Sequence, residues 1–216
     1  MYKNVLLVGI DEFICDNFFK FVDKKILCLS DNLVYLEKLK KKFYINIYPL
    51  TYTESDILTF KSIISIKSYV INEIIFNVNY FLESKPIKSI NFDKFSLFFD
   101  LNFKFFFVLL KNLLPTSNNP KDIFITFLIN KRNIDKSNFL YQQECINTLL
   151  ISFMKELNKE FETQNMYVNC ISLENVNLFY RKSIYPYRRY NFSDENFYNV
   201  YKFLIKKKIR NKIIVS

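Results

Sequence analysis

The chain has 216 residues, of which 50% are hydrophobic and 24% are charged, and its formal net charge at pH 7 is +10. This length and apolar content predict one folded domain, spanning residues 1–216, with a core that needs no disulfide or metal. The sequence contains no His, which excludes imidazole catalysis, including Ser-His-Asp and Cys-His nucleophiles, and the His-ligated zinc sites.

Short apolar runs alternate along the chain with amphipathic stretches, which is typical of a parallel sheet with helices on both faces. Between the runs, Leu33, Leu36 and Leu39 mark one helix, and an apolar stripe from Ile146 to Phe161 marks another. This alternation predicts a single α/β domain with a three-layer, doubly wound parallel sheet of the Rossmann type. The predicted strands are Val5–Val8, Ile26–Leu29, Ile45–Tyr48, Glu73–Val78, Ile123–Leu128, Tyr167–Ile171 and Lys212–Val215.

The predicted helix from Phe92 to Leu114 differs from the others because Phe and Leu occupy almost all of its faces. Such a helix has to be buried on two sides, which one sheet cannot do alone. A partner subunit on the second side would explain the pattern, and so would drift to Phe at surface positions in an AT-rich genome. We expect self-association through this helix and the helix that starts at Tyr141.

The cysteines Cys15, Cys28, Cys145 and Cys170 show neither CxxC spacing nor paired-ligand spacing. Each lies among apolar neighbours, as reduced core thiols do, so we expect no metal site. The apolar stretch from Val5 to Ile10 is too short for a signal peptide, and no run reaches the eighteen residues of a membrane span. These features predict a cytoplasmic protein that does not enter a membrane.

Basic residues are scattered along the chain, apart from one dense cluster at Lys206 to Lys208, Arg210 and Lys212. A cluster of this kind can bind RNA by neutralising its phosphates. Enrichment of lysine by codon drift in an AT-rich genome raises the charge without selection for nucleic acid. We therefore expect a solvated surface at this cluster rather than a nucleic-acid site.

Several short segments occur in the order and at the spacing of a known enzyme family. Gly9 follows the first strand, and Asn77 to Asn79 follow the fourth. The stretch from Phe107 to Pro115 ends in Leu-Leu-Pro, Tyr141 opens a helix, and a Val-Asn-Cys-Ile run begins at Val168. In these segments the chain resembles the short-chain dehydrogenase/reductase family over nearly its whole length, nearest to the YciK-type bacterial branch. The resemblance implies the strand order 3-2-1-4-5-6-7.

The resemblance also implies an NAD(P)-dependent oxidoreductase that transfers hydride to or from a small carbonyl or alcohol substrate. In the family pattern Gly9 opens the coenzyme turn, Asn77 lies beside the coenzyme, Tyr141 is the catalytic acid and base, and Asn102 supports it. Asp31 follows the second strand where the branch has an arginine for a 2′-phosphate, so it favours NAD over NADP. An N-cap role explains Asp31 equally well.

Two catalytic positions of the family pattern carry different residues. Tyr-x-x-x-Lys reads Tyr141 to Cys145, without the lysine, and Leu128 stands where the family has its serine. A tyrosine titrates near 10 and needs a nearby cation to exchange a proton at pH 7, and leucine cannot hydrogen-bond a substrate carbonyl. The sequence therefore predicts weakened or lost catalysis, unless Lys131 or Lys136 replaces the lost cation. The alternative is a non-catalytic relic that serves as a binding or scaffold protein.

The coenzyme turn itself has lost its later glycines. In the family these glycines let the pyrophosphate approach a helix N-terminus, whereas Phe13 and Cys15 would fill that space here. Asp11 and Glu12 would each repel a phosphate by about 4 kcal/mol at 4 Å and an effective dielectric constant near 20. This interpretation predicts poor binding of NAD or NADP. The other interpretation is a helix start whose two acids complement the helix dipole.

Overall fold

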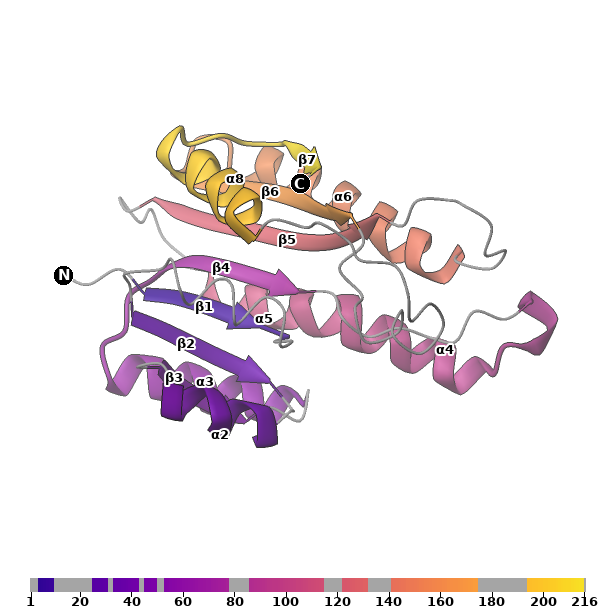
Figure 1. The fold of residues 1–216 in the computed structure, drawn as a ribbon, viewed down its shortest axis with the longest axis horizontal. Helices are drawn as coiled ribbons and strands as arrows, with labels where there is room; N and C mark the ends of the chain where they lie inside the picture. Colours follow the sequence, from indigo (N-terminus) through magenta and orange to yellow (C-terminus); the bar gives the residue numbers. More distant parts are fainter. Residues whose placement is uncertain are drawn as a thin grey trace.

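A computed structural model of the chain places one parallel sheet at its centre (Figure 1). Its seven strands have the order β3-β2-β1-β4-β5-β6-β7. The strands are β1 Asn4–Val8, β2 Lys25–Ser30, β3 Ile45–Pro49, β4 Ile71–Asn77, β5 Ile123–Lys131, β6 Met166–Glu174 and β7 Ile213–Val215. The residues that the structure describes are 4–9, 25–30, 33–42, 45–49, 53–77, 86–114, 122–131, 141–174 and 194–215.

The predicted α/β fold, its parallel sheet and the strand order are confirmed. Six strands have five to nine residues, and the seventh, β7, is a three-residue edge strand. Strand order reverses between β1 and β4, and in a doubly wound sheet the ligand crevice lies at the carboxyl ends of the strands at such a reversal.

The helices form two layers, one on each face of the sheet (Figure 1). Helices α3, α5 and α6 share a core layer with Leu6, Phe76 and Phe127 of the sheet. Helices α2 and α8 cover the opposite face, with Ile75 and Leu128. Both faces of the central strands are therefore buried, which explains why the strands read as nearly continuous apolar runs. The helices are α2 Leu33–Lys42, α3 Glu54–Ile66, α4 Phe92–Phe99, α5 Phe105–Leu113, α6 Tyr141–Glu160 and α8 Asp194–Lys206.

Helices α3 and α8 were not predicted from the sequence. Helix α3 begins at an N-cap, where the Thr53 side chain accepts a hydrogen bond of 3.2 Å from the Asp56 amide. It ends in a Schellman motif, in which the amide of Tyr69 donates to the Ile64 carbonyl and that of Ser68 donates to the Ser65 carbonyl. Ser68 takes the left-handed position of this motif, with φ of 50°.

The Phe-rich segment is one continuous helical stretch with a π-helix, η2 Asp100–Lys104, between α4 and α5. Phe98, Phe105 and Phe106 are buried against the sheet layer. The sheet covers only one side of the segment, as the sequence analysis expected, because Phe92 is 78% exposed and Phe107 46% exposed. A short 3-10 helix, η1 Ile87–Ser89, precedes α4. In the parts of the chain that the structure describes, no helix combines the length and the apolarity that a membrane span requires.

Candidate functional site

The candidate site lies at the carboxyl ends of β1, β4 and β5, where the strand order reverses (Figure 1). Val8 at the end of β1 pairs with Phe76 of β4, and Asn77, the last residue of β4, pairs with Leu128 of β5. The parallel register thus brings together three positions that the sequence analysis singled out, Gly9, Asn77 and Leu128.

Gly9 is the only glycine of the chain, and its place requires one. Its φ is +73°, in the left-handed region that side chains disfavour, and its amide donates a hydrogen bond of 3.1 Å to the Leu29 carbonyl. A Cβ at Gly9 would lie 2.5 Å from the carbonyl oxygen of Asn77. The missing side chain therefore lets the turn after β1 pass directly against the end of β4.

The structure describes one of the predicted coenzyme positions, Asn77, and leaves another, Asp31, outside the described residues. Asn77 is buried, with 6% of its surface exposed, at the carboxyl end of β4. Asp31 lies outside the described residues, as do Asp11, Glu12 and Phe13 of the coenzyme turn. The choice between their coenzyme roles and their capping roles stays a prediction.

Asn102 lies in the π-helix and is fully buried. Its Nδ2 donates a hydrogen bond of 2.9 Å to the carbonyl oxygen of Phe98, one turn earlier in the same segment. The π-helix packs against α6, which begins at Tyr141. Asn102 thus contributes a hydrogen bond within a widened turn next to α6. Its supporting role for Tyr141 stays a prediction, because the Tyr141 side chain lies outside the described residues.

The two substituted catalytic positions are placed clearly. Leu128 is 1% exposed and shares its core layer with Ile75 and Ile171, so this position carries a buried aliphatic side chain without a hydroxyl. Cys145 is an exposed free thiol one helical turn after Tyr141. Neither of the lysines considered as a replacement, Lys131 and Lys136, has a described side chain.

Sequence reasoning missed a polar group that follows Tyr141 directly. Gln142 and Gln143 are 4% and 5% exposed, and Gln143 Nε2 donates a hydrogen bond of 3.1 Å to Asn147 Oδ1. Gln142 Nε2 and Gln143 Oε1 are buried without a hydrogen-bond partner in the described part of the protein. The sequence offered one signal for this group, because the polar residues Gln142 and Gln143 come directly before the apolar stripe that begins at Ile146. Within the same part, no group of three or more Cys, Asp or Glu residues could hold a metal ion.

The buried thiols next to this site are not nucleophiles. Burial raises the pKa of Cys170, on β6, to about 12, and it raises the pKa of Cys28, on β2, well above its usual range. A thiol reacts as its thiolate, so both cysteines are inert core residues at neutral pH. This agrees with the interpretation of both as core thiols, whereas the same interpretation was wrong for Cys145, which is exposed on α6.

No family model matches the chain, and no similar curated protein was found. Solved structures with the same fold are numerous. A short-chain dehydrogenase from Shigella flexneri, complexed with NADP, is 14% identical, covers 99% of this chain and 96% of its own, and has a TM-score of 0.84. Serine dehydrogenase from Escherichia coli is 13% identical, with coverage of 99% and 96% and a TM-score of 0.77. The chain therefore has the fold that short-chain dehydrogenases have.

Proposed function

We propose that the protein descends from an NAD(P)-dependent oxidoreductase of the short-chain dehydrogenase type, and that hydride transfer to or from a carbonyl or alcohol is weak or lost in it. The observation that carries this proposal is the buried Leu128 at the carboxyl end of β5. In the resemblance this place belongs to the serine that hydrogen-bonds the substrate carbonyl, which leucine cannot do. The YciK-type branch and a cytoplasmic location remain expectations.

The place of the candidate site supports a dinucleotide as its ligand. Gly9 and Asn77 lie at the carboxyl ends of β1 and β4, and the strand-order reversal between these strands is the usual place for such a ligand. Gly9 and Asn77 would line the site, and Asp31 would lie by the ribose of NAD. The solved structure from Shigella flexneri holds NADP, which supports this choice of ligand class. A bound NAD(P) would accept or supply the hydride.

The chain's own part in the reaction would be proton transfer by Tyr141 within a segment supported by Asn102. With Cys145 one turn later, no positive charge at that position stabilises the phenolate. One proton-transfer effect contributes about 10² to 10⁴ in rate, so the combined loss of lysine and serine predicts a very slow enzyme.

Coenzyme binding and turnover can be measured separately on the purified chain. Titration with NADH and with NADPH, followed by nucleotide fluorescence, gives the dissociation constant, and absorbance at the nicotinamide band gives turnover with a panel of small aldehydes and ketones. We expect turnover far below the ~10 s⁻¹ that is typical of enzymes. Turnover near that typical rate would contradict weakened catalysis, and micromolar binding of either nucleotide would exclude a relic without coenzyme.

The second candidate function is a non-catalytic binding or scaffold role, and the aromatic face favours it. We define the aromatic face as Phe92 and Phe107, which are 78% and 46% exposed along α4 and α5. Phe103 and Phe107 also contact Phe153 of α6, with ring centroids 5.4 Å and 5.9 Å apart. A second copy of the chain, docking by two-fold symmetry through α4, α5 and α6, would cover this face.

Sedimentation of two lysine variants tests the homodimer. Phe107→Lys places a charge in the aromatic face, and we expect it to shift the protein to monomers. Ile66→Lys, at an 81% exposed position on α3, is the matched control and should leave the assembly unchanged. A wild-type monomer at tens of micromolar, or equal behaviour of the two variants, would exclude this interface.

A further inference from the structure

Helix α8 has an outward side that the core does not use. Phe197, Tyr201 and Leu204 point into the sheet layer and are at most 3% exposed. Lys202, Phe203 and Lys206 are exposed, and Lys206 follows Phe203 by three residues and Lys202 by four, so it lies next to both on the helix surface. We call these three residues, together with the exposed Lys207 in the turn that follows, the basic face.

An apolar side chain in the middle of this cationic group is the unusual feature. Phe203 is 50% exposed although it has lysines one residue before it and three and four residues after it. Lys206 and Lys207 make no ion pair within the described residues, and Lys202 lies over the ring of Tyr198, 5.6 Å from its centroid. The helix C-terminus explains a preference for Lys206, but it does not explain an exposed aromatic ring.

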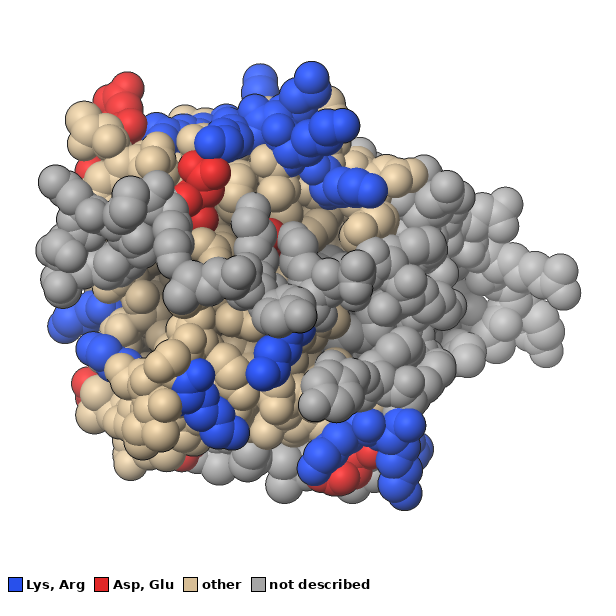
Figure 2. Space-filling model, turned by 90° about the vertical axis from the view of Figure 1, so that its left-hand side faces the viewer, with Lys and Arg blue, Asp and Glu red and all other residues tan. Residues whose placement is uncertain are grey.

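Lysine and arginine side chains gather at the top of the view in Figure 2, at the height where α8 and β7 lie in Figure 1. Because α8 runs antiparallel to the strands, its C-terminus lies at their amino ends, beside Asp122, which precedes β5. The basic face therefore lies at the edge of the sheet opposite to the candidate coenzyme site. A ligand there would not compete with a dinucleotide.

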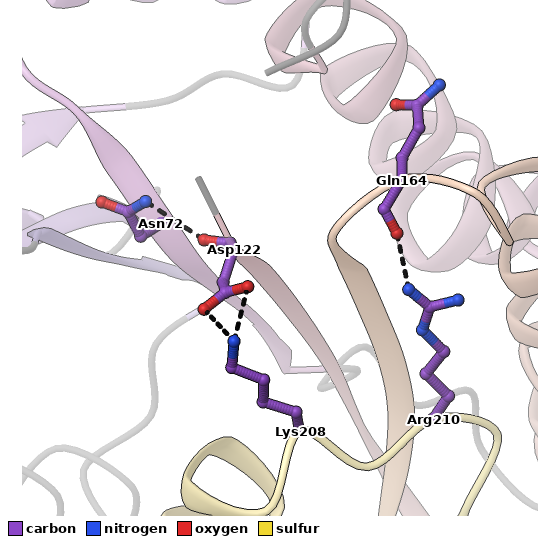
Figure 3. Close-up of polar contacts among 5 residues, drawn as sticks. All are labelled: Asn72, Asp122, Gln164, Lys208 and Arg210. Atoms are coloured by element: carbon purple, nitrogen blue, oxygen red, sulfur yellow. Dashed lines mark hydrogen bonds and ion pairs between the residues drawn. The ribbon is translucent and has the colours of Figure 1, made fainter. Parts of the chain in front are cut away.

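The turn after α8 is held in place by other cations of the same cluster (Figure 3). Lys208 Nζ lies 3.1 Å and 2.9 Å from the two carboxylate oxygens of Asp122, and this contact raises the pKa of Lys208. Arg210 donates to the carbonyl oxygens of Glu162 and Gln164, at 2.7 Å and 2.5 Å, and lies over the ring of Tyr167. These two cations are used for structure, which leaves the lysines of the basic face available to a ligand.

We propose that the basic face binds single-stranded RNA, with its lysines on the phosphates and Phe203 stacked on a base. Single-strand binding sites combine cations along the backbone with aromatic rings that stack on bases of any sequence. A membrane fits less well, because the apolar side of α8 is buried in the core and only Phe203 could enter lipid. The lysine-rich composition alone is explained by a solvated surface, whereas Phe203 among the lysines is what the structure adds.

Fluorescence anisotropy of a labelled twenty-nucleotide oligouridine tests the proposal on the full chain. Three phosphate contacts predict a slope near −2 for log affinity against log salt, which is roughly a twenty-fold loss between 50 and 200 mM salt. Phe203→Ala should weaken binding at least about five-fold through lost stacking. Leu58→Ala, at a 49% exposed position on α3 outside both the basic face and the aromatic face, is its control and should leave affinity unchanged.

A charge-matched pair of triple variants separates this face from general electrostatic attraction. Lys202, Lys206 and Lys207 all changed to Gln should lose the salt-dependent binding, whereas Lys38, Lys40 and Lys41 of α2 changed to Gln should keep it. Equal losses in both variants, no effect of Phe203→Ala, or binding to phosphatidylserine vesicles in place of RNA would overturn the proposal. RNA binding is measured independently of NADH or NADPH binding. The RNA proposal can therefore be overturned while the proposed function stands, and the reverse also holds.

Discussion

The hydroxyl of Tyr201 donates a hydrogen bond of 2.5 Å to Oε2 of Glu73, joining two residues 128 positions apart in the chain. Tyr201 lies on α8 and Glu73 on β4, and they are 3% and 1% exposed. A buried carboxylate is costly unless it accepts hydrogen bonds. The contact therefore joins the last helix to a central strand of the sheet and offsets part of the cost of burying Glu73.

Replacing Tyr201 by Phe removes this donor while keeping the ring. We expect the free energy of unfolding to fall by about 1 to 3 kcal/mol, because Glu73 stays buried with one hydrogen bond fewer. Urea unfolding of Tyr201→Phe, Glu73→Met and the double variant gives the coupling between the two side chains. We expect the double variant to be more stable than the sum of the two losses predicts, and additive losses would contradict a direct contribution of the bond.

The two buried thiols predict a loss of stability in alkaline solution. Their pKa values are raised in the folded protein, to about 12 for Cys170, so above pH 9 only the unfolded chain releases these protons. Stability is then full below about pH 8.5 and falls as the pH rises, by about 1.4 kcal/mol per pH unit for each thiol. Above pH 10 the raised pKa of the buried Tyr201 adds to the fall.

Urea unfolding between pH 8 and pH 10 measures this slope. Cys170→Ala should have a shallower dependence than the wild type, by a difference in slope that approaches about 1.4 kcal/mol per pH unit toward pH 10. Cys145→Ala removes an exposed thiol and is the matched control, for which we expect the wild-type slope. If Cys170→Ala keeps the wild-type slope, the burial of this thiol does not control the alkaline loss.

Ser68 occupies a position that suits glycine. Its φ of 50° lies in the left-handed region, which costs a residue with a Cβ about 1 to 2 kcal/mol. Glycine avoids this cost but loses more backbone entropy on folding, which offsets part of the gain. We expect Ser68→Gly to stabilise the protein by about 0.5 to 1 kcal/mol, which is roughly 1 to 4 °C in melting temperature at this chain length. Ser62→Gly, in the middle of α3, should destabilise it by about 0.5 kcal/mol.

Gly9 represents the opposite case, because no side chain fits there. In Gly9→Ala the new Cβ would lie 2.5 Å from a backbone oxygen that cannot move away without shifting β4. With the cost of positive φ added, we expect a loss of more than about 2 kcal/mol in the free energy of unfolding. Urea unfolding measures it, and a loss below about 0.5 kcal/mol would show that the turn relaxes freely.

Restoring the missing cation should restore part of the chemistry. We expect Cys145→Lys to raise NADH-dependent carbonyl reduction by about 10² or more, and Leu128→Ser in the same chain to raise it further. Thr148→Lys adds the same charge at an exposed position of α6 three residues later and should have no effect. Equal rates for all variants would place the defect in coenzyme binding, which the nucleotide titration measures directly.

The apolar runs of the sequence were enough to predict the strands, their parallel arrangement and the α/β class. A strand that is buried on both faces has to be apolar nearly throughout, so β1, β2 and β5 can be predicted from the sequence alone. Leu128 and Cys145 were singled out because the resemblance to the short-chain dehydrogenase/reductase family implies a serine and a lysine at these positions. The apolar character of the strands is a local property, because it depends on each residue and its neighbours in the sequence.

Only the tertiary structure showed how Glu73, Gly9, Asn102 and Phe203 are placed, because their surroundings come from groups far apart in the sequence. Glu73 is an acidic residue in an apolar run, and a partner that helps to bury it, Tyr201 on α8, lies 128 positions away in the chain. Position 9 requires a residue without a Cβ because the carbonyl oxygen of Asn77, 68 residues later on β4, would lie 2.5 Å from such an atom. The periodicity of the sequence indicates neither the π-helix around Asn102 nor the exposure of Phe203. The burial of Asn102 and the exposure of Phe203 depend on the neighbours that the folded chain brings to them.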